Sequence, residues 1–147
     1  RINIDPKDVR VVEPLVEILK EHDALDRVCL GSFSDRRLRR CRTLLGPGLC
    51  TSAGPLAVAR VRLSSLGLPT GRPAAHCLQV PVRQGGIPLV DRRFVDHAHA
   101  RGMQVHVWTI DDPAEMHRLL DLGVDGLMTD QPTLLRSVLI DREDWVA

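Results

Sequence analysis

The chain has 147 residues, 44% hydrophobic and 27% charged, so it is long enough for one domain with a buried core and is not disordered by composition. Its 20 Lys and Arg and 19 Asp and Glu leave a formal charge of +1, which argues against a whole surface dedicated to nucleic acid or to membranes. Aromatic residues make up only 3%, too few to stack on single-stranded nucleic acid, and no run of about 18 apolar residues is present to span a bilayer.

Short apolar runs alternate with amphipathic helical patterns along the whole chain. The runs predict strands at residues 2–6, 28–33, 48–51, 76–80, 105–110 and 126–129. Helices are expected at about 12–21, 35–45, 55–65, 91–102, 113–122 and 132–140. The punctuation supports these bounds, because Ser34 and Asp112 are typical N-cap residues and Gly46 and Gly123 follow helix ends.

This alternation, without a hairpin signal such as Asn-Gly, predicts an α/β fold with a parallel sheet covered by helices. Two architectures fit it: a doubly wound open sheet, or part of a (β/α)₈ barrel. Six strand–helix units are two short of a closed barrel. The first residue is Arg1 rather than Met and runs straight into a predicted strand. We therefore expect a piece that begins inside a larger fold.

Two helical patterns have predicted buried faces. In the first helix we expect Leu15, Ile18 and Leu19 to be buried. The arginine-rich helix 35–45 places Leu38, Cys41 and Leu45 on one face. Its arginines are therefore interpreted as a solvated helix face rather than a nucleic-acid site.

The four cysteines show neither zinc-finger spacing nor a Cys-x-x-Cys pair. They are Cys29, Cys41, Cys50 and Cys77, each among apolar neighbours. Buried, reduced thiols are favoured over disulfides, and we expect a cytoplasmic protein.

The first strand carries the most informative polar residues. Because side chains alternate along a strand, Asn3, Asp5 and Lys7 share one face and Ile2 and Ile4 the other. Sites in parallel α/β folds are built at the carboxyl ends of strands. The carboxylate suits a hard divalent cation and the ammonium suits a phosphate, while a single ion pair at a strand end is an equal alternative.

Near the other end of the chain, Trp108 lies at the carboxyl end of a predicted strand. It can line a pocket and pack on the carbon skeleton of a ligand, although a core or rim aromatic is the simpler interpretation. Asp130 precedes Pro132 at the start of the last helix and is expected to cap it.

These segments resemble one known family. The sequence INIDPK is similar to the third-strand motif of the glycerophosphodiester phosphodiesterase family, and VHVWTIDDPAEMHRLLDLGVDGLMTDQP closely resembles its C-terminal signature. The motif GSFSD around Phe33 is similar to the family's fourth-strand motif. The resemblance implies a (β/α)₈ barrel, of which this chain would supply strands three to eight, as one N-terminally incomplete domain over residues 1–147.

The resemblance also implies roles for individual residues. Asp5, in place of the usual Glu, would be a ligand of a divalent cation, magnesium or calcium. Lys7 would lie near the phosphate, Trp108 would line the alcohol end of the pocket, and Phe33 would add apolar wall. Pro6 departs from the usual aliphatic residue and is tolerable only if the strand ladder does not need its missing N–H. The implied reaction hydrolyses a glycerophosphodiester to glycerol 3-phosphate and an alcohol, with no nucleic-acid partner and no membrane span.

One departure from the family pattern limits the roles that the resemblance implies for this chain. The family's general acid and base are histidines in His-Arg-Gly and His-Asp motifs, with two more acidic metal ligands between them, and neither motif occurs in this sequence. The histidines present are interpreted as structural, with His97, His99 and His117 on helix surfaces; they are His22, His76, His97, His99, His106 and His117. We expect this chain alone to lack the full catalytic set. Two alternatives are a truncated, non-catalytic barrel used for binding, and an open-sheet domain for a small phosphorylated ligand.

The whole hypothesis depends on one geometric expectation. Asp5 and Trp108, about a hundred positions apart, should meet at the same edge of a rolled parallel sheet.

Overall fold

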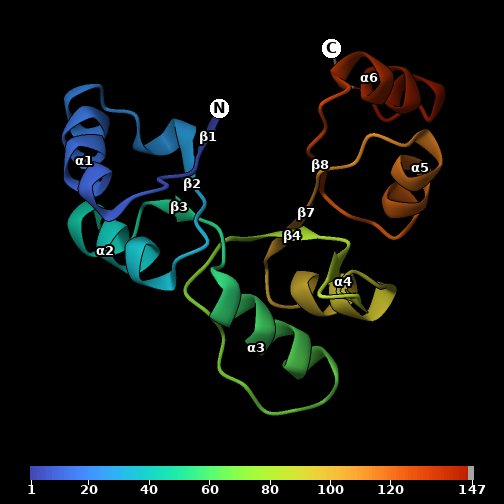
Figure 1. Cartoon of the computed structure of the whole chain (residues 1–147), viewed down its shortest axis with the longest axis horizontal. Helices are drawn as coiled ribbons and strands as arrows, with labels where there is room; N and C mark the ends of the chain where they lie inside the picture. The colour runs from blue at the N-terminus through green and yellow to red at the C-terminus, as the bar shows by residue number, and fades with distance from the viewer. Residues whose placement is uncertain (146–147) are drawn as a thin grey trace. The chain divides into compact units, whose positions relative to one another are not determined.

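The computed structural model describes residues 1–145, which form two compact units divided between Leu78 and Gln79. Figure 1 shows the alternation of strands and helices in both. The first unit contains β1 (Ile2–Ile4), α1 (Val12–Glu21), β2 (Val28–Leu30), α2 (Asp35–Leu45), β3 (Cys50–Thr51) and α3 (Pro55–Ser65), with short 3₁₀ turns η1 (Val9–Val11) and η2 (Leu25–Arg27). The next elements are β4 (Cys77–Pro81), β5 (Arg83–Gln84), β6 (Ile87–Pro88), α4 (Arg92–His99), β7 (Gln104–Trp108), α5 (Pro113–Asp121), β8 (Gly126–Leu127) and α6 (Pro132–Asp141). All six predicted strands are present, most of them shorter than expected.

The first unit is built on a parallel sheet in the order β1-β2-β3. Its core fills the space between this sheet and the helices α1 and α2, with Leu30 and Leu38 fully buried. β1 is an edge strand of the sheet, since within residues 1–145 no strand pairs with its outer side. Ile2 is accordingly 61% exposed, so the helices do not cover this end of the predicted sheet.

Helix α1 has the predicted bounds but presents a different face to the core. Val12, Val16 and Leu19 are buried, whereas Ile18 is exposed and Leu15 is only partly buried. Apolar residues lie on more than one stripe of this helix, and packing against α2 selects the stripe through Val12 and Val16.

Helix α2 confirms both its predicted face and its predicted caps. Leu38, Cys41 and Leu45 are buried. The Ser34 side chain accepts a hydrogen bond from the Arg37 amide at 3.3 Å, and Gly46 ends the helix with a positive φ of 81° that favours glycine.

The second sheet has the order β4-β7-β8, and β7 pairs with β8 in parallel. Alternate residues of β7, Val105 and Val107, are fully buried, as are Phe94 of α4 and Met116 of α5. Helix α5 begins as predicted, because the Asp112 side chain accepts a hydrogen bond from the Glu115 amide at 2.8 Å. This cap fixes the turn that follows the carboxyl end of β7.

A short antiparallel hairpin, β5–β6, interrupts the parallel pattern after β4. Gly85 and Gly86 form its two-residue turn, with φ of 55° and 81°. Positive φ at both positions matches the turn type that suits the twist of a hairpin. The expectation of no hairpin was therefore wrong: Gly-Gly between two short runs is itself a hairpin signal.

The architecture is α/β with parallel sheets, as predicted. Among residues 1–145, no helix is both long and apolar enough to cross a membrane.

Candidate active site

Asp5 and Lys7 follow β1 at the carboxyl end of the first sheet. The ammonium of Lys7 donates to Oδ2 of Asp5 at 2.5 Å; the Lys7 side chain is 78% exposed and that of Asp5 29%. The second oxygen, Oδ1 of Asp5, is buried and has no hydrogen-bond partner among residues 1–145. A buried carboxylate oxygen without a partner carries a large desolvation cost, which a ligand would offset. Asp5 and Lys7 thus form the ion pair that the sequence analysis gives as the equal alternative, and their roles toward a cation and a phosphate stay predictions.

Ser32 connects the ends of β1 and β2. Its hydroxyl donates to the Pro6 carbonyl at 3.5 Å and accepts from the Ser34 amide at 3.3 Å and from Nε of Arg37 at 3.0 Å. Pro6 lies beyond the β1 ladder, so its missing N–H needs no strand partner, as required. In this motif we had singled out Phe33, which is 62% exposed, and had missed Ser32. The sequence feature that could have indicated this role is the position of Ser32 two residues before the N-cap Ser34.

Asp35 connects this loop to the next one. Its Oδ2 accepts a hydrogen bond from the Leu56 amide at 3.1 Å, at the first turn of α3. Gly54, the N-cap residue of α3, lies so close that a Cβ there would be 2.6 Å from Oδ1 of Asp35. A side chain at residue 54 would therefore require the Asp35 carboxylate to shift from this position.

Trp108 is the last residue of β7 and is partly buried, and its peptide bond to Thr109 is cis. It belongs to the second unit, whereas Asp5, Lys7 and Phe33 belong to the first. The expected meeting of Asp5 and Trp108 at one edge therefore stays a prediction.

The loops after β7 and β8 are joined by Asp111. Its Oδ1 accepts from the Thr129 hydroxyl at 2.7 Å and from the Asp130 amide at 2.8 Å. The N-cap position of α6 is Gln131, whose side chain makes no capping hydrogen bond. The prediction that Asp130 caps this helix was wrong, because Asp111 fixes the loop and leaves Asp130 exposed.

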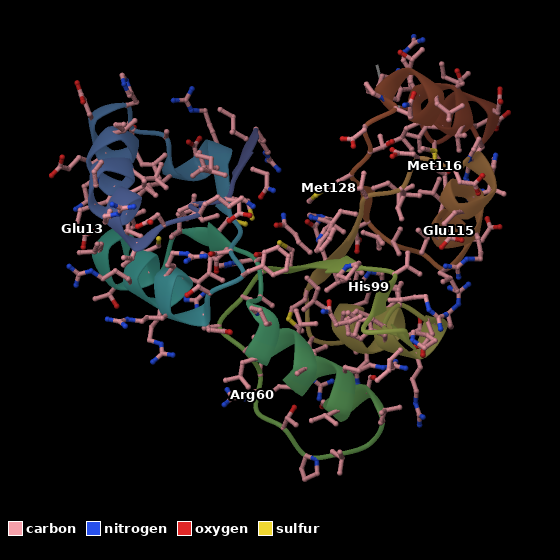
Figure 2. The ribbon with its side chains drawn as sticks, in the orientation of Figure 1. Glu13, Arg60, His99, Glu115, Met116 and Met128 are labelled. Atoms are coloured by element: carbon pink, nitrogen blue, oxygen red, sulfur yellow. The ribbon has the colours of Figure 1, made fainter. Side chains whose placement is uncertain are left out.

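The Gly-Val-Asp-Gly motif lies at the amino ends of β7 and β8, opposite to the carboxyl-end loops that Asp111 joins. Oδ2 of Asp125 accepts from the Val105 amide at 2.7 Å and lies 2.7 Å from Nε2 of His99, which Figure 2 labels on α4. This carboxylate therefore ties α4 to the starts of β7 and β8. We interpret it as structural.

Three of the remaining histidines, His97, His106 and His117, are partly buried. Burial lowers the pKa of His106, with Asp125 opposing the shift, and burial followed by Arg101 and Arg93 lowers that of His97. Nε2 of His97 is buried and has no partner among residues 1–145, so its assignment to the surface was wrong. His117 is half-buried beside Arg142, 3.4 Å away, contrary to the same expectation.

All four cysteines are free thiols, of which Cys41 and Cys77 are buried as predicted and Cys29 and Cys50 only partly buried. Cys29 and Cys50 are register partners on β2 and β3, and Sγ of Cys29 lies 3.8 Å from Sγ of Cys77 on β4. The neighbouring Cys77 thiol and burial raise the pKa of Cys29, while burial, followed by the effect of Cys29, raises that of Cys50 to about 11. High pKa values keep these groups as thiols, which are poor nucleophiles.

The side chains present fit only part of a site for the divalent cation that the family resemblance implies. Asp5 fits one ligand position, because Oδ1 is buried without a partner. Within residues 1–145, however, no group of three or more His, Cys, Asp or Glu side chains is placed to hold a metal ion. The described part of the chain thus offers one carboxylate ligand rather than a complete site.

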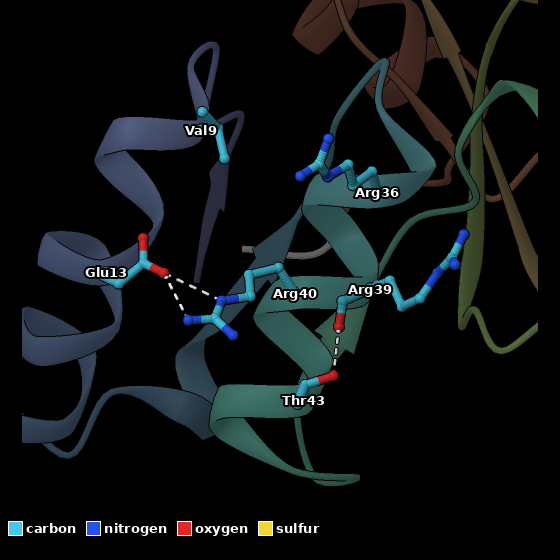
Figure 3. A pocket seen from close by; sticks show the side chains of 6 residues that line it. All are labelled: Val9, Glu13, Arg36, Arg39, Arg40 and Thr43. Carbon is cyan, nitrogen blue, oxygen red and sulfur yellow. Dashed lines mark hydrogen bonds and ion pairs between the residues drawn. The ribbon is translucent and has the colours of Figure 1, made fainter.

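A groove of about 440 Å³ between η1, α1 and α2 contains none of the predicted site residues. Its lining is Val9, Glu13, Arg36, Arg39, Arg40 and Thr43. Figure 3 shows the Arg40 guanidinium donating to Glu13, at 2.9 and 3.0 Å, while the Arg36 and Arg39 side chains extend in other directions. The guanidinium groups do not converge on one point, so the groove is not a second candidate site.

Comparison with known proteins gives consistent matches over most of the chain. Residues 2–134 match the model of the glycerophosphoryl diester phosphodiesterase family. A probable glycerophosphodiester phosphodiesterase 2 of Mycobacterium tuberculosis is 41% identical over 157 aligned positions, which cover 99% of this chain and 57% of that protein.

Solved structures agree in fold. A glycerophosphoryl diester phosphodiesterase of Silicibacter pomeroyi superposes with a TM-score of 0.73 at 24% identity, covering 94% of this chain and 46% of that one. A phosphodiesterase of Oleispira antarctica, solved in complex with the product sn-glycerol-3-phosphate, superposes with a TM-score of 0.66 at 22% identity. The match covers 90% of this chain and 50% of that one. The chain thus spans about half the length of these relatives.

The third-strand and C-terminal motifs, the parallel sheets and the match over residues 2–134 agree with one another. The chain belongs to the glycerophosphoryl diester phosphodiesterase family, whose named members are phosphoric diester hydrolases.

Proposed function

We propose that the protein carrying this chain hydrolyses glycerophosphodiesters to glycerol 3-phosphate and an alcohol with the help of a divalent cation, magnesium or calcium. The observation that carries this proposal is the pair at the end of β1, where Asp5 has a buried, unpartnered oxygen and Lys7 lies at its other oxygen. Family membership and the product held by the Oleispira antarctica relative support the substrate class.

The proposed roles follow from the chemistry of each side chain. Asp5 would donate Oδ1 to the cation, which when bound neutralises charge that develops on the phosphoryl oxygens. Lys7, largely exposed, would lie against the phosphate as a compact positive charge. Trp108 would pack on the organic part of the substrate, and Phe33 would add apolar surface.

The proposal extends to the fold. The solved relatives support a partial (β/α)₈ barrel, in which this chain supplies strands three to eight as one domain. A cytoplasmic location belongs to the same proposal.

The two lysines of the chain allow a controlled test of the site. Lys7→Ala should lower the rate of glycerophosphodiester hydrolysis by the full-length protein by about a hundredfold, because a charge that stabilises the transition state is lost. Lys20→Ala, an exposed lysine of α1, should leave the rate unchanged. The rate is followed by release of glycerol 3-phosphate.

Asp5→Ala tests the cation ligand separately. We expect the magnesium or calcium concentration required for half-maximal activity to rise, which a purely structural ion pair does not explain. Unchanged activity and metal requirement in these variants would remove both residues from the mechanism. Substrate binding without turnover by the unmutated protein would favour the non-catalytic binding module instead.

A further inference from the structure

The outer surface of α3 and the loop after it has an unusual distribution of apolar residues. Leu56, Leu63, Leu66 and Leu68 are between 44% and 55% exposed. The buried side of the same helix combines Val61 with Ser64 and Ser65. The helix thus buries two serines while it exposes its leucines, so its outer face is suited to contact something apolar.

The leucines are held in place by the way the helix ends. Gly67, with φ of 97°, donates its amide to the Ser64 carbonyl at 3.0 Å, and the Leu68 amide donates to the Leu63 carbonyl at 3.2 Å. This pair of hydrogen bonds is a Schellman motif, which brings the residue after the glycine back beside the last turn of the helix. The Thr70 hydroxyl also donates to the Arg60 carbonyl at 3.0 Å. The loop is therefore ordered before any partner binds.

Positive charge accompanies these leucines. Leu56, Arg60 and Leu63 have the spacing i, i+4, i+7 and form one stripe of α3. Arg60 and Arg72 are exposed, and among residues 1–145 neither makes an ion pair. Figure 2 shows Arg60 extending outward from α3.

The charge is not local to α3. Residues 36–90 contain no Asp or Glu, although the whole chain has 19. They contain nine arginines: Arg36, Arg37, Arg39, Arg40, Arg42, Arg60, Arg62, Arg72 and Arg83. The outer surface of α3 lies within this basic segment. The carboxylate of Asp35, which lies just before this segment, accepts a hydrogen bond from the Leu56 amide at the first turn of α3.

We propose that α3 and residues 66–72, here called the α3 surface, bind peripherally to an anionic lipid bilayer. Exposed leucines enter the headgroup–acyl boundary while Arg60 and Arg72 stay at the level of the lipid phosphates. Charge complementarity favours this occupant, because an acid-free basic segment attracts an anionic bilayer. The proposal does not depend on the hydrolase function, since binding is measured without substrate.

The apolar part is tested by sedimentation of the purified protein with vesicles of phosphatidylglycerol and phosphatidylcholine in equal parts. Leu63→Ser and, separately, Leu68→Ser should each weaken binding by about tenfold, the loss expected for one leucine side chain. The matched control is Ile18→Ser: Ile18 is 52% exposed, but it lies on α1, which also carries Glu13, Glu17 and Glu21. Circular dichroism verifies folding of each variant.

The electrostatic part is tested with the same vesicles. Arg60→Gln should weaken binding by about fivefold, whereas Lys20→Gln on α1 should not. Binding should also fall with salt and be weak on phosphatidylcholine alone. Failure to sediment with anionic vesicles, or equal effects of the α3 and α1 variants, would overturn the proposal. A dimer in ultracentrifugation that Leu63→Ser converts to a monomer, without change in vesicle binding, would overturn it in favour of a second copy of the chain.

Discussion

At the scale of single residues, Ser32 shows how much of a site a small side chain can determine. It is 8% exposed and its hydroxyl is shared among the Pro6 carbonyl, the Ser34 amide and Nε of Arg37. Through these bonds it fixes the loop after β2 to the end of β1, where Asp5 and Lys7 lie.

Ser32→Ala should lower the free energy of unfolding by about 1–3 kcal/mol, because it leaves polar groups at this junction without their partner. Ser137→Ala is the control: its exposed hydroxyl donates to the Thr133 carbonyl on α6. Urea denaturation measures both. Equal losses in the two variants would contradict the role given to Ser32.

The sequence predicted Asp5 and Lys7 as a pair because strand periodicity alone places them on one face. It did not predict Ser32 or Asp111, since both act through loop contacts that join different strands. Asp130 was chosen as a cap for its position before Pro132, but Asp111 holds its amide at 2.8 Å. Residue type and spacing do not reveal such competition between nearby carboxylates.

At the scale of elements, the hairpin β5–β6 is the clearest departure from the predicted pattern. Gly85 and Gly86 have φ of 55° and 81°, a region where a Cβ is costly.

Gly85→Ala and Gly86→Ala should each lower the free energy of unfolding by about 1–2 kcal/mol. Gly48→Ala provides the comparison, because Gly48 does not have a positive φ and its Cβ would meet nothing within 4 Å. That variant should be neutral or slightly stabilising, since alanine restricts the unfolded chain. A loss for Gly48→Ala as large as for the hairpin variants would argue against strain as the cause.

The helices were predicted better than their faces. Helix capping by Ser34, Gly46 and Asp112 depends only on residues near each helix end. These residues predicted helix bounds that the structure confirms. The buried face of α1 depends on how the helix packs against α2, which no local pattern contains. For that reason Ile18 was misplaced while the bounds of the helix were right.

At the scale of the whole molecule, two partly buried histidines make stability depend on pH. In the folded state the pKa values of His106 and His97 lie below the ordinary value of 6.5. As pH falls through the unfolded value, the unfolded chain therefore binds more protons than the folded one.

The free energy of unfolding should accordingly decrease as pH falls from about 7 toward about 5. His106→Gln should make this dependence shallower, because it removes the group whose folded-state pKa is lowered. Urea denaturation at several pH values gives the slopes. Parallel slopes for the wild type and His106→Gln would show that His106 does not contribute.

The net charge of +1 conceals an uneven distribution of charge along the chain. A basic, acid-free segment over residues 36–90 is balanced by acidic residues elsewhere. Whole-chain charge argues against a uniformly charged surface, but it does not reveal this basic segment, which is found only by following the charges along the chain.

The contact between Gly54 and Asp35 has a consequence for how this fold tolerates change. Alanine at residue 54 would displace a carboxylate that holds the first turn of α3, and the hydrogen bond to the Leu56 amide would be lost with it. Two successive strand–helix repeats are thus coupled at this contact, because residue 54 acquires a side chain only when the Asp35 carboxylate moves away from it.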